Sequence, residues 1–488
     1  MVEKKNGNIV DYLAAFGDKS FAQMPFNDVD SLALCQLCYL KFDGIVPDVW
    51  SNKPSVTLDD IYKHPDYEKL YADERFEKNN RQLFEGMRKG RRFAGLRLNC
   101  YINLVEKEYE TQFSAVTYLL EGGSLYIAYR GTDETIVGWK EDFNMAYMDP
   151  VPGQALGVKY LNMVTSRLKV PIYVGGHSKG GNLAEYAALK CAETVRDRIR
   201  KIYSMDGPGV RELGRLEEYE RKKEAGNQET GEEGLTFAEK ETGSLSDRED
   251  DIRRKTVSEK ETGNGSVQKE TAEEDTKALL RLKKDRAAYE KIKGKIVKIL
   301  PQSSLIGMLF EAGSRQYITV ESNSFGLGQH DPFTWRVQEN HFVTLEDIES
   351  ISRFRDDTLN AWISSLDEDK RRLFVDTLYE VISASKAEDL IAFTADWHKS
   401  MTGVINALKE VDEDTRNVLR QIIRSLFEIA RDRAKEQTPK RRPFFAGDRK
   451  RQPKWISGGK HFKIKKNGQE AFEKKSVPGK EEEALRQA

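Results

Sequence analysis

The stretch at residues 174–182, Val-Gly-Gly-His-Ser-Lys-Gly-Gly-Asn, constrains the fold more than any other part of this chain. Gly176, Ser178 and Gly180 occupy the three fixed places of the G-x-S-x-G pattern. The apolar run before it predicts a buried strand, and the residues after it have apolar side chains on one helical face. A serine at such a strand–turn–helix junction stands clear of the sheet in strained backbone geometry, and the flanking glycines avoid collisions. The pattern predicts a nucleophilic serine. The alternative is a glycine-rich turn that only lets the strand and the helix pack.

The periodicity of the remaining chain predicts an α/β fold. Alternating apolar residues predict three strands before the serine, at 96–102, 113–119 and 125–129, and three after it, at 201–205, 296–300 and 317–320. A helix is predicted near residues 157–168, directly before the strand that leads to the serine. Strands first, then alternating helices and strands, are typical of a mixed sheet whose later part is parallel, with helices on both faces.

The composition changes along the chain and divides it into segments. Charged residues make up 33% of the 488 residues, and the mean hydropathy is -0.66, which is more polar than a compact domain needs. We expect the excess to lie in a charged, largely disordered insertion and a basic disordered tail. The predicted organisation is an N-terminal segment (1–25), an α/β domain in two parts (26–211 and 291–340), the insertion between them (212–290), a helical extension (341–436) and the tail (437–488).

Cysteine and hydrophobic patterns indicate the compartment. Residues 1–19 lack the apolar core of a secretion signal, and no later run is apolar enough to cross a bilayer, so we expect a cytoplasmic protein. Cys35 and Cys38 form a C-x-x-C inside an apolar helical run. Redox motifs lie at helix starts, and zinc sites need a second pair of ligands. We therefore interpret both cysteines as buried thiols.

The tail is the one strongly basic region of a chain whose net charge is -1. Between residues 440 and 466 it carries eleven Lys or Arg, one acidic residue and four interleaved aromatic residues. Such a segment can contact an anionic membrane surface or nucleic acid. The alternative is a disordered tail that only increases solubility. We predict no specific nucleic-acid partner.

A serine nucleophile needs a histidine to take its proton, and the chain has six histidines. His177 adjoins Ser178, and we expect its side chain to point away. His341 is a second choice, but it stands where a helix is predicted to begin. His330 follows the glycine-rich loop 326–329 after the last predicted strand, where the chain order Ser, acid, His places the base.

A carboxylate and two N–H donors would complete the site. Asp206 ends the strand after the serine strand, so it should reach the same sheet edge as Ser178. The alternative is an aspartate that only satisfies a turn, leaving the histidine without a carboxylate partner. The backbone N–H groups of Lys179 and Thr132 are the predicted oxyanion donors, because one follows the nucleophile and the other follows an earlier strand.

These motifs resemble a known family. Residues 129–132, Trp139 with Asp142, and residues 176–181 are similar to the class 3 lipases of the α/β-hydrolase superfamily, and residues 27–335 resemble its bacterial Mbeg-like branch. The resemblance implies an α/β-hydrolase fold, Ser178 as nucleophile, His330 as base, the amides of Thr132 and Lys179 as oxyanion donors, and Asp142 as a brace of the oxyanion loop. It implies no metal or organic cofactor. Class 3 lipases commonly carry the acid after the later strand, where this chain has Pro-Gln-Ser-Ser at 301–304, so the acid is Asp206 or absent.

Two functions fit this sequence. The first is a serine hydrolase that cleaves carboxylic esters of small molecules or lipids through an acyl-enzyme on Ser178. The second is a hydrolase-fold scaffold or binding protein, with weak or lost catalysis, whose basic tail contacts a membrane or nucleic acid. The complete serine, histidine and oxyanion set favours the first function, because a binding protein does not need all of them. The polar insertion and the missing acid after the later strand favour the second.

Overall fold

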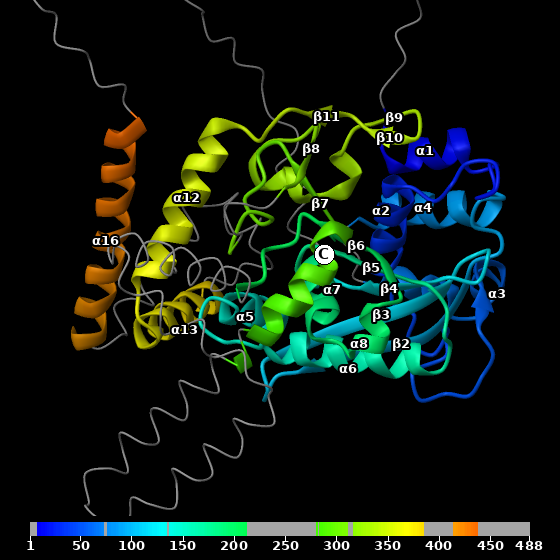
Figure 1. The fold of residues 1–488 in the computed structure, drawn as a ribbon, viewed down its shortest axis with the longest axis horizontal. Helices are drawn as coiled ribbons and strands as arrows, with labels where there is room; N and C mark the ends of the chain where they lie inside the picture. Colours follow the sequence, from blue (N-terminus) through cyan, green and yellow to red (C-terminus); the bar gives the residue numbers. More distant parts are fainter. Residues whose placement is uncertain are drawn as a thin grey trace, which may run out of the picture. The chain divides into compact units, whose positions relative to one another are not determined.

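A mixed β-sheet organises the chain in the computed structural model (Figure 1), which describes residues 7–72, 76–133, 136–211, 280–281, 283–310, 316–384 and 413–437. In the described residues the sheet has nine strands, in the spatial order β1 (Val56–Thr57), β2 (Arg97–Glu106), β3 (Thr111–Leu119), β4 (Leu125–Tyr129), β5 (Ile172–His177), β6 (Ile199–Met205), β7 (Ile296–Pro301), β8 (Ile318–Val320) and β11 (Thr344–Leu345). Neighbouring strands from β1 to β4 are antiparallel, and those from β4 to β8 are parallel. This confirms the predicted mixed sheet with a parallel later part.

Helices cover both faces of the sheet, as predicted. Successive side chains of a strand point to opposite faces. In β4, Tyr126 and Ala128 therefore join one hydrophobic core, and Leu125, Ile127 and Tyr129 join the other. The first core is closed by α1 (Ile9–Phe16), α2 (Asp28–Leu37) and α4 (Glu77–Lys89), beside the shorter α3 (Leu58–Tyr62) and η1 (Tyr67–Tyr71). The second core is closed by α6 (Pro152–Ser166), α7 (Lys179–Lys190) and α8 (Glu193–Arg196).

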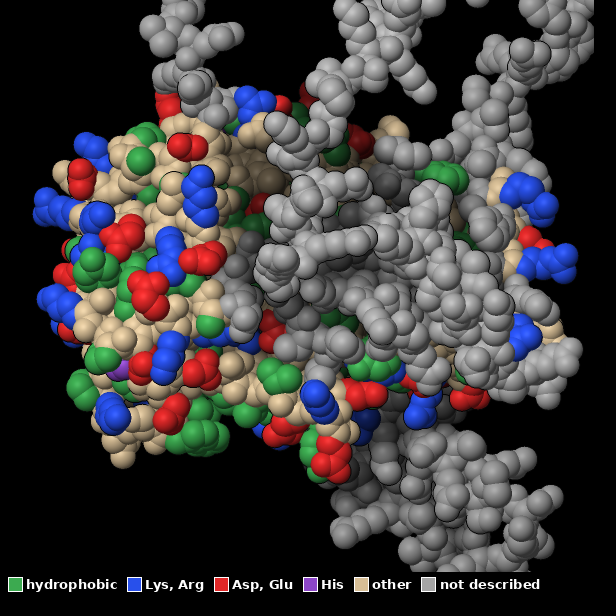
Figure 2. Space-filling view, turned by 180° about the vertical axis from the view of Figure 1, so that it is seen from behind, with side chains coloured by type: hydrophobic (Ala, Val, Ile, Leu, Met, Phe, Trp, Pro, Cys, Tyr) green, Lys and Arg blue, Asp and Glu red, His purple; other side chains and the backbone are tan. Residues whose placement is uncertain are grey.

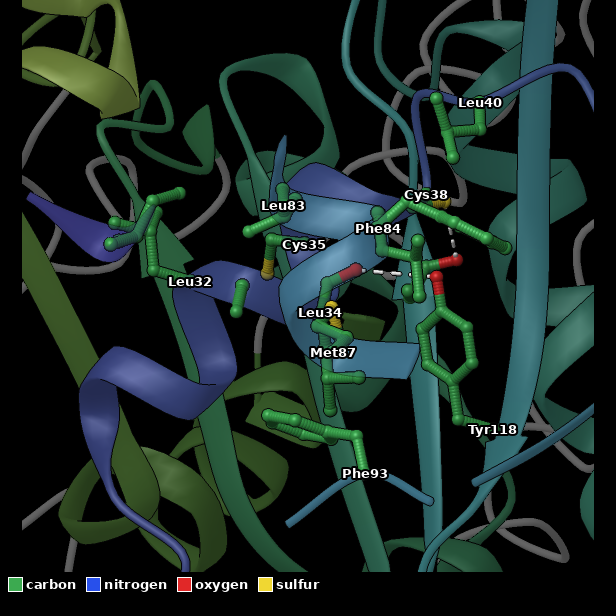
Figure 3. Close-up of a cluster of buried hydrophobic side chains, with 14 of the residues drawn as sticks. Leu32, Leu34, Cys35, Cys38, Leu40, Leu83, Phe84, Met87, Phe93 and Tyr118 are labelled. Carbon is green, nitrogen blue, oxygen red and sulfur yellow. Dashed lines mark hydrogen bonds between the residues drawn. The ribbon is translucent and has the colours of Figure 1, made fainter. Parts of the chain in front are cut away.

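The two cysteines of the C-x-x-C motif lie inside the first core, in α2 and directly after it (Figure 3). Both are free thiols with no exposed surface. Burial raises the pKa of the Cys35 thiol to about 12 and raises the pKa of Cys38 as well. A thiol that stays protonated is unreactive at neutral pH. The prediction of buried structural thiols is confirmed.

A buried ion pair ties the N-terminal segment to the first core. The Arg92 guanidinium contacts both carboxylate oxygens of Asp30 in α2, at 2.6 Å from Nε and 2.5 Å from Nη2, and neither side chain is exposed. Its remaining N–H groups donate to the carbonyl oxygens of Lys19, Met24 and Pro25. Residues 7–25 therefore pack as part of the α/β unit.

The C-terminal extension differs from the prediction at its start. Residues 341–345 are extended: β10 (His341–Phe342) pairs with β9 (Val337–Gln338), and β11 pairs antiparallel with β8. The helices begin only at α12 (Ser350–Ser365), followed by α13 (Glu368–Ala384) and α16 (Glu413–Gln437). The cause is tertiary strand pairing. The free edge of β8 pairs with the next segment of the chain as a strand, and this pairing overrides the local helix-start pattern.

The predicted insertion and tail lie almost wholly outside the described residues. The chain is helical at residues 283–292, and Ala288 and Ile292 of this segment are buried in the second core. Because β7 pairs with β6, the chain returns to the same sheet after the insertion. No helix in the described ranges is long and apolar enough to span a bilayer. Figure 2 shows basic and acidic side chains interspersed on the visible described surface, with scattered hydrophobic side chains between them.

Candidate active site

Ser178 lies on a strained turn between β5 and α7. Its backbone has φ 58° and ψ -134°, a left-handed conformation that costs energy for any residue with a side chain. A Cβ atom on Gly176 would lie 2.2 Å from the carbonyl carbon of Gly180, and one on Gly180 would lie 2.2 Å from the carbonyl oxygen of Tyr129. Gly176 is therefore required for β5 to approach α7 this closely, and Gly180 for α7 to approach β4. Ser178 keeps part of its surface exposed, as the sequence pattern predicts.

His330 and Asp206 form a hydrogen-bonded pair at the same sheet edge. Asp206 directly follows β6, the parallel neighbour of β5, and His330 ends the short helix η4 (Gly326–His330). The imidazole Nδ1 lies 2.6 Å from Asp206 Oδ2. Because a carboxylate only accepts hydrogen bonds, Nδ1 carries the proton, and in the neutral ring Nε2 has a lone pair. The Asp206 side chain is 1% exposed and that of His330 is 25% exposed, so the pair has a buried end and an accessible end.

One cavity of about 920 Å³ is lined by both Ser178 and His330. No hydrogen bond joins the Ser178 hydroxyl to the His330 ring in the part of the chain that the structure describes. Such catalytic contacts are often long before substrate binds and shorten in the complex. The structure thus brings the three predicted residues to one sheet edge, with the histidine–aspartate contact formed.

Ser304 is a site residue that the sequence analysis missed. Its hydroxyl donates to Asp206 Oδ1 at 2.5 Å and accepts the backbone N–H of Gly307 at 3.1 Å. Ser304 lies in the segment after β7 where class 3 lipases commonly carry a carboxylate. The segment here supplies a hydroxyl that orients the carboxylate of the neighbouring strand. Its position after β7 is the only signal that the sequence offered.

His177 positions the loop that carries the base. Its Nε2–H donates to the carbonyl oxygen of His330 at 2.8 Å, and its Nδ1 accepts from the Tyr39 hydroxyl at 3.0 Å. The ring centroids of His177 and His330 are 4.5 Å apart. Burial, together with the nearby His330, holds the pKa of His177 well below its ordinary value, so its ring is neutral. His177 therefore has no free nitrogen for Ser178, which agrees with its rejection as base, but its ring packs against His330.

Gln329 and Trp335 hold the same loop from its other side. The Gln329 side chain accepts from the Ser303 backbone N–H at 2.8 Å and donates to the Ser324 carbonyl oxygen at 2.9 Å. The buried Trp335 indole donates to the Gln329 carbonyl oxygen at 2.8 Å. These contacts restrict the backbone directly before His330.

The loop that contains Thr132 passes directly over the serine. A Cβ atom on Gly131 would lie 3.0 Å from Ser178 Cβ and 2.6 Å from the His177 carbonyl oxygen, so only glycine fits there. The hydroxyl of Thr132, the next residue, donates to Asp142 Oδ2. Lys179 is the first residue of α7, and the first N–H groups of a helix have no partner inside the helix. Thr132 and Lys179 both line the cavity with Ser178.

The Lys179 side chain runs away from the cavity into a buried polar cluster. Its ammonium lies 2.9 Å from Glu141 Oε2 and donates to the carbonyl oxygen and side chain of Gln112, at 2.9 and 2.5 Å. The other Glu141 oxygen accepts the Gly153 N–H at 2.6 Å. The Lys179 and Glu141 side chains are 1% and 0% exposed. This cluster links α7 to α5 (Ile136–Asn144), and sequence analysis predicted none of its side-chain contacts.

Asp142 contacts the oxyanion loop and the buried cluster at once. Its side chain is 31% exposed, but Oδ1 is enclosed without a hydrogen bond and lies 4.0 Å from the Lys179 ammonium. Burial raises the pKa of this carboxyl to about 6, and the nearby Lys179 and the Thr132 hydroxyl oppose the shift. Its hydrogen bond to Thr132 matches the bracing contact that the lipase resemblance implies.

We expect Asp142 to make stability depend on pH. The carboxyl titrates near 3.9 in an unfolded chain and near 6 here, so between these values the folded state binds more protons than the unfolded state. The free energy of unfolding therefore falls as pH rises from about 4 to about 6. Above about pH 6 the ionised Asp142 carboxylate destabilises the folded state. Asp142→Asn removes this contribution. Urea unfolding should show the variant gaining stability over the wild type between about pH 4.5 and about pH 7.5. If the difference in free energy of unfolding between the variant and the wild type is the same at both pH values, the pKa of Asp142 is not raised.

Comparison with known proteins gives a family. The Mbeg1-like family model matches residues 87–230 and 273–380, which is more than half of the chain and includes Ser178, Asp206 and His330. No curated protein and no solved structure matches the chain. The family match confirms the Mbeg-like resemblance that the motifs indicated. This chain, with its strained serine turn and its histidine–aspartate pair, therefore belongs to the Mbeg1-like family.

Proposed function

We propose that this protein is a serine hydrolase of the α/β-hydrolase fold, similar to class 3 lipases, that cleaves carboxylic esters through an acyl-enzyme on Ser178. The observation that carries the proposal is the strained Ser178 turn at the same sheet edge as the His330–Asp206 hydrogen bond. A turn that only packs a strand against a helix needs neither the exposed serine nor an oriented imidazole beside it.

In the first half-reaction, Ser178 Oγ attacks the ester carbonyl carbon while His330 Nε2 takes the hydroxyl proton. Asp206 accepts from Nδ1–H and stabilises the imidazolium that forms. The carbonyl oxygen becomes an oxyanion, which the amides of Thr132 and Lys179 stabilise. The C–O bond to the alcohol then breaks, and His330 returns its proton to the leaving alkoxide oxygen. The products of this half are the free alcohol and the Ser178 acyl ester.

In the second half-reaction, water replaces the alcohol. His330 takes a proton from the water as its oxygen attacks the acyl carbon, and a second oxyanion forms in the same place. The bond from carbon to Ser178 Oγ breaks, and the proton returns to the serine. The carboxylic acid leaves, and the site is restored. Every proton passes through His330, so the cycle needs no further acid or base.

Labelling with a fluorophosphonate tests the proposal, because this probe reacts with activated serines. We expect the wild type to be labelled and to hydrolyse p-nitrophenyl esters, and Ser178→Ala and His330→Ala to lose both properties. Ser166→Ala, at an exposed position of α6, is the matched control and should behave as the wild type. A folded wild type that neither reacts with the probe nor hydrolyses any ester would overturn the proposal in favour of a binding protein.

The basic tail gives this proposal a second part, contact with an anionic membrane surface. It rests on the eleven basic and four aromatic side chains between residues 440 and 466. Removal of residues 440–488 should weaken binding to vesicles that contain phosphatidylserine, while p-nitrophenyl acetate turnover stays unchanged. Unchanged vesicle binding would leave the tail as a solubilising extension.

A further inference from the structure

The cavity in front of Ser178 is bounded by the C-terminal helices. Trp362 from α12 and Leu366, directly after that helix, line it together with Phe374 and Val375 from α13. These helices follow the last strand of the sheet by sequence, and they have a small core of their own around Trp362 and Ile422. Their apolar side chains nevertheless face the same space as Ser178 and His330. A cavity of about 920 Å³ is at the upper end of the range for pockets that enclose small ligands, roughly 300–1,000 Å³.

Polar contacts hold both helices against the rest of the site. Lys140 of α5 pairs with Asp376 of α13, and its ammonium also lies over the Tyr379 ring, 5.1 Å from the centroid. Asn360 of α12 accepts the Phe310 backbone N–H at 2.9 Å and donates to the Met308 carbonyl oxygen at 3.1 Å. Figure 1 shows α13 beside α5. The two helices are therefore a built wall of the cavity.

The chemistry of the site assigns one side of the cavity to the acyl group. The leaving oxygen receives its proton from His330, so the alcohol part of an ester lies toward the loop 324–334. The acyl part would then lie on the other side, toward the oxyanion loop and α5, whose Trp139 and Phe143 line the cavity. Because α13 packs on α5, an acyl group on this side would continue along α12 and α13.

Among the described residues that line the cavity from α12 and α13, the surface is mostly apolar and the basic residue is paired. Arg371, the basic residue of α13 in the lining, donates to the Ile363 and Ser364 carbonyl oxygens at the end of α12, at 2.7 and 3.3 Å. Trp362 and Phe374 pack edge to face, with ring centroids 4.9 Å apart. An aliphatic chain fits such a surface, whereas a charged group would be desolvated there without a partner.

We infer that α12 and α13 form the binding wall for the aliphatic acyl chain of the ester, so that acyl chain-length preference is set by this C-terminal extension. The inference rests on the proposed hydrolase function and names its substrate class. Each methylene that the wall buries should raise kcat/KM by up to about fourfold. Long acyl esters are therefore preferred to acetate.

Chain-length profiles test the inference. We compare kcat/KM for p-nitrophenyl octanoate and acetate in the wild type, Val375→Trp and Leu366→Ala. Val375→Trp fills the cavity and should lower the octanoate-to-acetate ratio by at least about tenfold, and Leu366→Ala should lower it by about threefold or more. Asp357→Trp places the same side chain at an exposed position of α12 outside the lining, and its ratio should equal that of the wild type. Ratios that do not change in either cavity variant, with folding verified by circular dichroism, would overturn the inference.

A binding measurement separates this inference from the proposed function. Fluorescence of cis-parinaric acid should rise saturably on Ser178→Ala protein, and Val375→Trp in the same background should weaken that binding about tenfold or more. Saturable binding without any fluorophosphonate labelling of the wild type would mean that the wall binds aliphatic acids but the hydrolase proposal fails. Labelling and acetate turnover without cis-parinaric acid binding would mean that the hydrolase proposal holds and the wall inference is wrong.

Discussion

Asp206→Asn is expected to lower kcat/KM for p-nitrophenyl esters by about 10³–10⁴-fold while the protein stays folded. The carboxylate accepts from His330 Nδ1–H at 2.6 Å and is 1% exposed. An amide in its place can donate its own N–H to Nδ1, which would move the ring proton to Nε2 and leave no base for Ser178. Steady-state kinetics at saturating and limiting ester, with circular dichroism of each variant, measure the effect.

Asp331→Asn is the matched control, because Asp331 adjoins the histidine in sequence. Its carboxylate accepts the Phe333 backbone N–H at 2.9 Å and caps the short helix η5 (Pro332–Thr334). We expect a loss of less than about tenfold there, since a cap contributes mainly to local stability. The loss of kcat/KM in Ser304→Ala should lie between those of the two variants. This substitution removes one hydrogen bond to Asp206 but keeps the charge of the Asp206 carboxylate. Near-normal turnover in Asp206→Asn would show that the base does not depend on this carboxylate.

Lys179→Met is expected to lower the free energy of unfolding by about 3–5 kcal/mol. The substitution removes the ammonium and leaves the Glu141 carboxylate, which is 0% exposed, without a cation. The backbone N–H groups of Gln112 and Gly153 still donate to Glu141, at 3.1 and 2.6 Å, but they do not neutralise it. Denaturation by urea, monitored by circular dichroism, gives the change.

Two further variants distinguish a buried charge from lost packing. Adding Glu141→Gln to Lys179→Met removes the unpaired charge and should recover a large part of the loss, although the single amide oxygen can accept only one of the Gln112 and Gly153 backbone N–H groups. Lys370→Met breaks an exposed pair with Asp367 and should cost at most about 1 kcal/mol. If the double variant is no more stable than Lys179→Met, the loss comes from the lysine stem and not from the charge.

The sequence by itself determined the parts of this protein that local patterns encode. Side chains at the glycines around Ser178 would collide with neighbouring backbone, so this short stretch alone predicts the strand–turn–helix junction. Alternating apolar residues located the strands from β2 to β8, because the side chains of a strand point alternately to two faces. His330 and Asp206 followed from chain order and strand ends, since the carboxyl ends of parallel strands meet at one edge.

Only the tertiary structure decided which distant residues support that edge. Ser304, Tyr39 and Glu141 have ordinary local sequences, and their roles come from partners that lie far away along the chain. The strand β11 forms at Thr344 because the edge of β8 was free, although the local pattern favoured a helix. The cavity wall from α12 and α13 depends on how helices pack across the molecule. Periodicity gives the apolar face of an element, but the partner of that face is set by long-range packing that no single segment encodes.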